Sequence, residues 1–146
     1  MSSRKITFNL GHALVKTGNL SKDQFKSAYD ECLKTGKRIK DVLISFGYIN
    51  ETDLAKVFSR KLNMPAFSLK GLCIHPDVKR MIPVELARKY QAIPVFVSGN
   101  VLAVATDDPL DYDSLNKIAD HTQKDILTAF TSGKDITYAL NAYDKI

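Results

Sequence analysis

The sequence predicts an α+β protein, in which an N-terminal unit of four helices is followed by a small mixed α/β subdomain. Two observations support this fold class. One apolar pattern within residues 9–61 recurs after 29 residues, and the spacing of apolar residues changes from helical to strand-like after residue 63. We therefore expect a helical repeat subdomain over residues 1–63 and an α+β subdomain over residues 64–146.

Each copy of the repeat predicts a helical hairpin. Gly18, which accepts a positive φ, ends a short helix expected over residues 6–16. Ser21, followed three residues later by Gln24, forms a capping-box pattern that starts a second helix ending at Gly36. The second copy repeats this order, with apolar positions Ile39, Val42, Leu43 and Phe46, a glycine at Gly47, a cap at Asn50, and then Leu54, Val57, Phe58 and Leu62.

Strands and helices alternate in the second half. Asn63-Met64-Pro65 ends the helical pattern, because proline disfavours helical geometry in the residue before it. Residues 92–97 and 101–106 are rich in β-forming residues, and Ser98-Gly99-Asn100 between them predicts a hairpin turn. Further strands are expected over residues 66–69 and 126–131, and helices over residues 83–90, 110–119 and 135–143.

Composition and charge restrict the classes of function. The chain has 45% hydrophobic and 25% charged residues, as soluble globular proteins do. It contains no apolar run of the roughly 18 residues needed to cross a bilayer and no signal-peptide core, so we expect a cytoplasmic chain without direct membrane insertion. The net charge of +5 comes from the first 63 residues, where Lys and Arg outnumber Asp and Glu. These lysines are scattered around the helices, so we expect a solvated basic face and no nucleic-acid partner.

No motif predicts an enzyme. Gly36-Lys37 lacks the earlier glycine of a phosphate-binding loop, and Gly133-Lys134 is not followed by Ser or Thr, so we expect no ATPase activity in this segment. The three histidines, His12, His75 and His121, do not have the spacing of metal ligands. We expect them to face solvent or to form local hydrogen bonds. Cys32 and Cys73 do not belong to a CxxC motif. We expect both to be small, semi-buried and unpaired side chains.

An acidic cluster follows the second hairpin strand. Its members are Asp107, Asp108, Asp111 and Asp113. Carboxylates can bind magnesium or calcium, but their spacing does not match an EF-hand loop. Asp-Asp-Pro after a strand is more often a turn, with Asp111 or Asp113 capping the next helix. We favour the turn.

Three features together resemble a known family. They are the doubled pattern, Pro83 with Ala92-Ile93-Pro94-Val95, and the Asp-Pro-Leu-Asp segment within residues 105–111. The chain resembles, over nearly its whole length, the N-terminal domain of type II secretion and type IV pilus assembly ATPases, and within it the cyclic di-GMP-binding, MshE-like form. In that family two copies, separated by five residues, line a groove for the dinucleotide; residues 33–37 are the spacer here.

The resemblance implies a non-catalytic regulatory or docking module that binds cyclic di-GMP along the repeat and requires no cofactor. The ligand positions that it implies are Asn9, Leu10, Gly11, Phe25, Tyr29, Cys32, Arg38, Ile39, Lys40, Leu54, Phe58, Lys61 and Asp108. Four of them depart from the family pattern: Asn9 replaces arginine, Lys40 replaces glycine, and Cys32 and Lys61 replace glutamine. Arg38 is the best preserved polar contact, since its planar fork can bind a phosphate or a guanine edge bidentately.

A second hypothesis follows from those departures. A protein-interaction adaptor that has lost the nucleotide would use the helical repeat or the sheet edge to dock a partner. By resemblance, the partner under either hypothesis is a secretion or pilus ATPase core or an inner-membrane platform protein. Such a partner would hold the chain at the inner face of the inner membrane.

Overall fold

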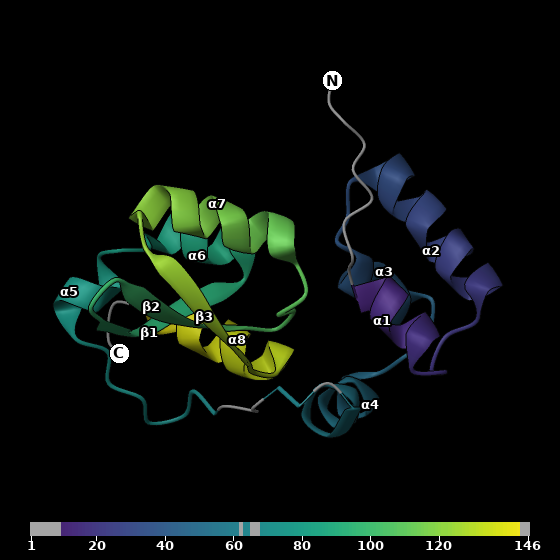
Figure 1. Cartoon of the computed structure of the whole chain (residues 1–146), viewed down its shortest axis with the longest axis horizontal. Coiled ribbons are helices and arrows are strands. Elements are labelled where there is room, and N and C mark those ends of the chain that lie inside the picture. The colour runs from purple at the N-terminus through teal and green to yellow at the C-terminus, as the bar shows by residue number, and fades with distance from the viewer. Residues whose placement is uncertain (1–9, 62, 65–67, 144–146) are drawn as a thin grey trace.

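The computed structural model describes residues 10–61, 63–64 and 68–143 and confirms the α+β class. Figure 1 shows two parts side by side, the N-terminal helices in one and a sheet with its helices in the other. Residues 6–9, Leu62 and residues 66–67, which belong to predicted elements, lie outside the described residues.

The helical half consists of two similar hairpins. The first contains α1 (Leu10–Lys16) and α2 (Lys22–Thr35), and the second contains α3 (Ile39–Ser45) and α4 (Glu51–Lys56). Equivalent glycines end the first helix of each hairpin in the left-handed region, Gly18 at φ 83° and Gly47 at φ 75°. The predicted caps are also present, because Ser21 and Gln24 form a capping box and Asn50 accepts the amide of Asp53.

A wider turn follows α4. Residues Val57–Lys61 form a π-helical turn, η1, which the periodicity of the sequence did not predict. The Lys61 ammonium at the end of this turn reaches back to the turn after α1.

Among the residues that the structure describes, the sheet has three strands in the order β1-β2-β3. β1 (Ala92–Ser98) pairs antiparallel with β2 (Val101–Thr106), as the predicted hairpin requires, and β2 pairs in parallel with β3 (Asp125–Phe130). The helices of this half are α5 (Pro76–Lys79), α6 (Val84–Tyr90), α7 (Tyr112–Thr122) and α8 (Gly133–Asn141). α5, α6 and α8 pack against β1, and α7 packs against β3.

Two hydrophobic clusters form the core, and they do not divide cleanly along the chain. One lies between the sheet and its helices. The other lies among the N-terminal helices but includes Leu110 and Phe130 from the second half. The Phe130 ring lies 4.6 Å from that of Phe58. The division after residue 63 stays a prediction, and the helical core is completed by residues beyond it.

Several sequence predictions need correction. Ser68 and Leu69 are not in a strand, and α5 was not predicted because its four residues are too few to show a period. α7 begins at Tyr112 instead of residue 110, because Asp111 caps it by accepting the Ser114 amide. α8 begins at Gly133 instead of residue 135, because Ser132 caps it. Cys73 is exposed, whereas Cys32 is half-buried as expected.

Within the described ranges, no helix is long and apolar enough to cross a membrane.

Candidate functional site

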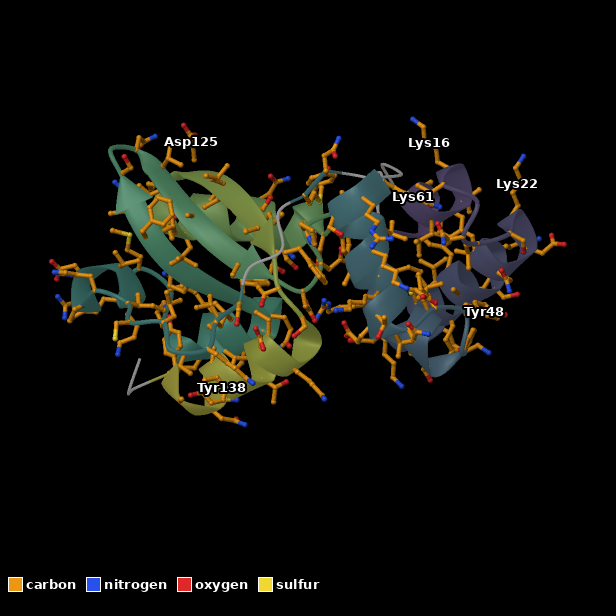
Figure 2. The ribbon with its side chains drawn as sticks, turned by 90° about the horizontal axis from the view of Figure 1, so that it is seen from below. Lys16, Lys22, Tyr48, Lys61, Asp125 and Tyr138 are labelled. Carbon is orange, nitrogen blue, oxygen red and sulfur yellow. The ribbon has the colours of Figure 1, made fainter. Side chains whose placement is uncertain are left out.

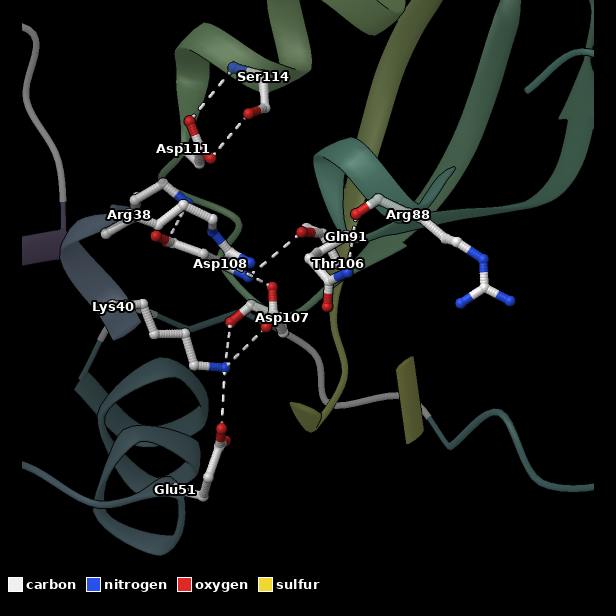
Figure 3. A network of polar contacts seen from close by, with 11 residues as sticks. Arg38, Lys40, Glu51, Arg88, Gln91, Thr106, Asp107, Asp108, Asp111 and Ser114 are labelled. Atoms are coloured by element: carbon white, nitrogen blue, oxygen red, sulfur yellow. Dashed lines mark hydrogen bonds and ion pairs between the residues drawn. The ribbon is translucent and has the colours of Figure 1, made fainter. Parts of the chain in front are cut away.

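The start of the second copy faces the loop after β2. Arg38 is the residue immediately before α3, and its Nη2 donates to Oδ1 of Asp107 at 2.7 Å. Lys40, two residues further, directs its ammonium to the same residue, 3.0 Å from the Asp107 carbonyl and 3.3 Å from Oδ2. Figure 3 shows both cations converging on Asp107. The best preserved polar contact of the family pattern is therefore engaged by an acid from the other half.

Lys40 is buried, with 1% of its side chain exposed. A buried ammonium is tolerated only where acceptors replace water. Three oxygens do so here, two from Asp107 and Oε1 of Glu51, which lies 3.1 Å away at the start of α4. Lys40 thus ties α3 to α4 within the helical half and to the β2–α7 loop of the other half.

The start of α8 lies close to the same charged side chains. A Cβ placed on Gly133, the first residue of α8, would lie 2.9 Å from Oε1 of Glu51 and 3.9 Å from the ammonium of Lys40. A larger residue at the start of α8 would therefore displace the Glu51 carboxylate from its place beside Lys40.

The β2–α7 loop is fixed by its own hydrogen bonds. Oγ1 of Thr106 accepts the amide of Asp108, and Oδ1 of Asp108 accepts the amide of Leu110. Burial, followed by the charge of Asp111, raises the pKa of Asp108 to about 7, while the charge of Arg38 opposes this shift. Asp108 directly follows Asp107, the residue that binds Arg38.

The acidic cluster behaves as a turn. Asp111 caps α7, and Asp113 pairs with Lys117 on the same helix at 3.3 Å. Among the described residues, no group of His, Cys, Asp and Glu side chains is arranged to hold a metal ion.

The apolar positions of the predicted site fall into two groups. Leu10, Gly11, Leu54 and Phe58 are buried in the helical core. Those that reach the surface are Phe25, Tyr29, Cys32 and Ile39. Phe25 lies between two other rings, 4.7 Å from His12 and 6.0 Å from Tyr29, so α1 and α2 present an aromatic edge.

Two further predicted positions lie apart from this cluster. The ammonium of Lys61 donates to the Thr17 carbonyl at 3.2 Å and to Oδ1 of Asn19 at 3.1 Å, in the turn after α1 (Figure 2). Asn9 lies outside the described residues. The structure thus brings together Arg38, Lys40 and Asp108, and places Lys61 at another part of the helical half.

Sequence reasoning missed Asp107 and Glu51 as partners of the two cations. The sign available in the sequence was Lys40 itself, since its neighbours Ile39 and Val42 belong to an apolar stripe and a buried lysine needs carboxylates nearby. Those carboxylates are distant in sequence, and periodicity does not pair residues so far apart.

A pocket of about 410 Å³ lies between α7 and β3. Its lining consists of Tyr112, Leu115, Asn116, Ala119, Lys124, Asp125, Ile126 and Thr128. None of these is a predicted ligand position, so the pocket and the candidate site are different parts of the surface.

Two sequence relatives are similar to most of the chain. The type IV pilus assembly ATPase PilB of Myxococcus xanthus is 32% identical over 134 residues, which cover 92% of this chain and 24% of that protein. The type IV pilus assembly ATPase PilB of Thermus thermophilus is 29% identical over 133 residues, which cover 90% of this chain and 15% of that protein. The chain therefore spans a quarter or less of the relatives that it matches.

Two solved structures have a similar fold. A structure of MshE with cyclic di-GMP (cdg) has a TM-score of 0.66 and 26% identity, and the match covers 93% of this chain and 99% of that one. The N-terminal domain of XpsE has a TM-score of 0.69 and covers 97% of both chains at 17% identity, which shows the fold alone.

The MshEN domain model matches residues 62–145, which include the sheet, its helices and the β2–α7 loop with Asp107 and Asp108. Two of the three features on which the sequence resemblance rested, Pro83 with residues 92–95 and the Asp-Pro-Leu-Asp segment, lie within the matched residues. This chain belongs to the MshEN domain family.

Proposed function

We propose that this domain is a non-catalytic regulatory module that binds cyclic di-GMP along the helical repeat and transmits the bound state to a larger assembly. The observation that carries the proposal is the likeness to MshE with cyclic di-GMP over 93% of the chain. The surface chemistry is compatible with this ligand, because aromatic and aliphatic edges can stack on guanine bases and Arg38 can bind a phosphate.

The proposed contacts follow from exposure. Phe25, Tyr29, Cys32 and Ile39 reach the surface and would contact the bases. Arg38 would bind phosphate, and Asn9 and Lys61, the first and last residues of the repeat in the sequence, would add polar contacts. The buried positions Leu10, Gly11, Leu54 and Phe58 would support the groove from behind.

The assembly that we propose is a pilus or secretion machine. Both sequence relatives are type IV pilus assembly ATPases of which this chain spans a minor part, so the module would regulate an ATPase core or dock a membrane-platform protein. We place it in the cytoplasm, held at the inner face of the inner membrane by such a partner.

Isothermal titration calorimetry with cyclic di-GMP tests the ligand. We expect binding by the natural chain, and a loss of about tenfold or more in affinity for Arg38→Ala, the usual effect of removing one charged hydrogen bond. Arg60→Ala is the matched control, since Arg60 is exposed in the same half and is not a predicted ligand position. If no heat and no rise in melting temperature accompany high ligand concentrations, cyclic di-GMP is not the ligand.

One observation favours the adaptor as a second candidate. Arg38 and Lys40 are both paired with Asp107, so these polar contacts of the repeat already have partners within the chain. An adaptor would bind the cytoplasmic domain of a platform protein with or without the nucleotide. A pull-down with that purified domain distinguishes the two: retention by Arg38→Ala, without any effect of cyclic di-GMP, supports the adaptor.

A further inference from the structure

We propose that Asp107 is an internal competitor for the ligand: its carboxylate occupies Arg38 in the free protein and must release it before a phosphate can bind there. This inference rests on the proposed binding of cyclic di-GMP. In this proposal Asp107 sets the affinity for the ligand, and Lys40 holds Asp107 in place.

The side chain of Asp107 is held in place between the two cations. Only 7% of its side chain is exposed, and its two carboxylate oxygens are divided between the two cations, Oδ1 to Arg38 and Oδ2 to Lys40. The backbone carbonyl of Asp107 also accepts from Lys40, so the residue is held by its main chain as well as by its side chain. Release of Arg38 would therefore leave Asp107 in position and still paired.

Arg38 is the more easily released of the two cations. Its side chain is 22% exposed, whereas that of Lys40 is 1% exposed. It precedes α3 in extended geometry and makes no capping bond to that helix. Its Nε is buried and has no hydrogen-bond acceptor among the described residues, so the guanidinium is held mainly through one edge.

Exchange of Asp107 for a phosphate would keep Arg38 paired with an anion. Burial alone would lower the pKa of Arg38, but the charge and hydrogen bond of Asp107, together with the charges of Asp41 and Asp108, raise that pKa. A phosphate supplies the same charge and can accept two N–H groups, including the one on Nε. The exchange therefore trades one charge-assisted contact for another of the same kind.

Lys40 determines how the exchange affects the junction between the two halves, which consists of the contacts of Arg38 and Lys40 with Asp107. The family pattern has glycine at this position, which provides no cation. Here the ammonium continues to join Glu51 and Asp107 after Arg38 leaves, so the two halves stay attached while the tie through Arg38 is released. The bound state would then be reported by a loosened junction instead of by separation of the halves.

Calorimetric titration of Asp107→Asn with cyclic di-GMP tests the competition. Asparagine keeps the shape and the backbone carbonyl but removes the charge that holds Arg38, so we expect affinity about ten- to a hundredfold tighter than that of the natural chain, the range for one hydrogen bond between charged groups. The matched control is Asp41→Asn, because Asp41 is exposed and acts on Arg38 through its charge. We expect this variant to stay within about twofold of the natural chain, because exposed charges are screened by salt.

The double variant Arg38→Ala, Asp107→Asn gives the specific readout. Competition for Arg38 requires that Asp107→Asn has no effect on affinity once Arg38 is absent. Equal or weaker affinity of Asp107→Asn, with binding by the natural chain, overturns the inference and leaves the proposed function standing. If Asp107→Asn binds cyclic di-GMP and the natural chain does not, the inference is supported. If neither the variant nor the natural chain binds it, both the inference and the proposed function are wrong.

An NMR titration of the natural chain covers the case in which Asp107→Asn does not fold. The side-chain Nε–H signal of Arg38 and the backbone amide of Asp107 should both move as cyclic di-GMP is added, while the amide of Lys89, an exposed residue of α6 in the other half, should not. Movement of Arg38 without any change at Asp107 would show that the two are not exchanging partners.

Discussion

The two copies of the repeat share one local fold but have different surroundings. In the first copy Tyr29 reaches the surface, whereas its counterpart Phe58, 29 residues later, is fully buried against Phe130. In the first copy Gly11 is buried within helix packing, whereas its counterpart Lys40 crosses to Asp107. A duplicated helical pattern therefore specifies the hairpin, and single substitutions within it decide which copy becomes an internal junction and which remains a free surface.

The largest difference between the copies should appear at the aromatic pair. Phe58→Ala removes a fully buried ring and should lower the free energy of unfolding by about 3–5 kcal/mol. Tyr29→Ala, at the equivalent exposed position, should lower it by about 1 kcal/mol or less. Urea denaturation of both variants measures this, and equal losses would mean that the junction does not distinguish the copies.

The next difference concerns the buried lysine. In Lys40→Ala, Asp107 keeps its ion pair with Arg38 but loses the one with Lys40, and Glu51 loses its ion pair with Lys40. We expect this variant to destabilise the fold by about 3 kcal/mol, the lower end of the range for breaking a buried ion pair. Lys56→Ala, at an exposed position of α4, serves as control and should change stability by no more than about 0.5 kcal/mol. If Lys40→Ala lowers the stability no more than Lys56→Ala does, the ion pairs of Lys40 do not stabilise the junction.

A pH dependence should come from Asp108, which lies on the junction side. Its pKa is raised to about 7, so folding favours its protonated form; the stability that this confers is complete below the ordinary carboxyl pKa near 3.8 and is lost as the pH rises through 7. Asp108→Asn should therefore be more stable than the natural chain at pH 8, by about 2 kcal/mol, and nearly equal to it at pH 4.

Thermal melts of Asp108→Asn and the natural chain across this pH range provide the measurement. A difference that stayed constant from pH 4 to pH 8 would show that Asp108 does not titrate in the folded protein over that interval.

The smallest effects should be alike in the two copies. Ser21→Ala and Asn50→Ala each remove an N-cap and should each cost about 1 kcal/mol, because the capping geometry is local and does not depend on the second half. Chemical denaturation of the two variants checks this. A difference of more than about 1 kcal/mol between them would show that the junction also affects the helix ends.

The parts of the fold that the sequence predicted are those set by near neighbours. Ser21, Gly18 and Asn50 act on residues within one helical turn, and their caps were found where expected. The hairpin at Gly99 is equally local. The π-helical turn and α5 escaped prediction, because the first alters the period of a helix by a single residue and the second is too short to have one.

The candidate site was less predictable for a related reason. Resemblance pointed to Arg38 and Lys40 as ligand contacts, and it still supports Arg38 in the proposed function. Their contact with Asp107 spans 67 to 69 residues of sequence and depends on how the sheet is placed against the helices. No periodicity or motif within either half contains that information.

The presence of Leu110 and Phe130 in the helical cluster limits where the chain can be truncated. A fragment ending at residue 63 would keep both hairpins but lose these two side chains, and with them the ring that packs on Phe58, so we expect it to associate or to melt without cooperativity. Limited proteolysis between the halves should likewise yield two pieces that stay together until denaturant is added. The shortest length of chain that supports the repeat therefore extends through β3, well past the point where the repeat itself ends.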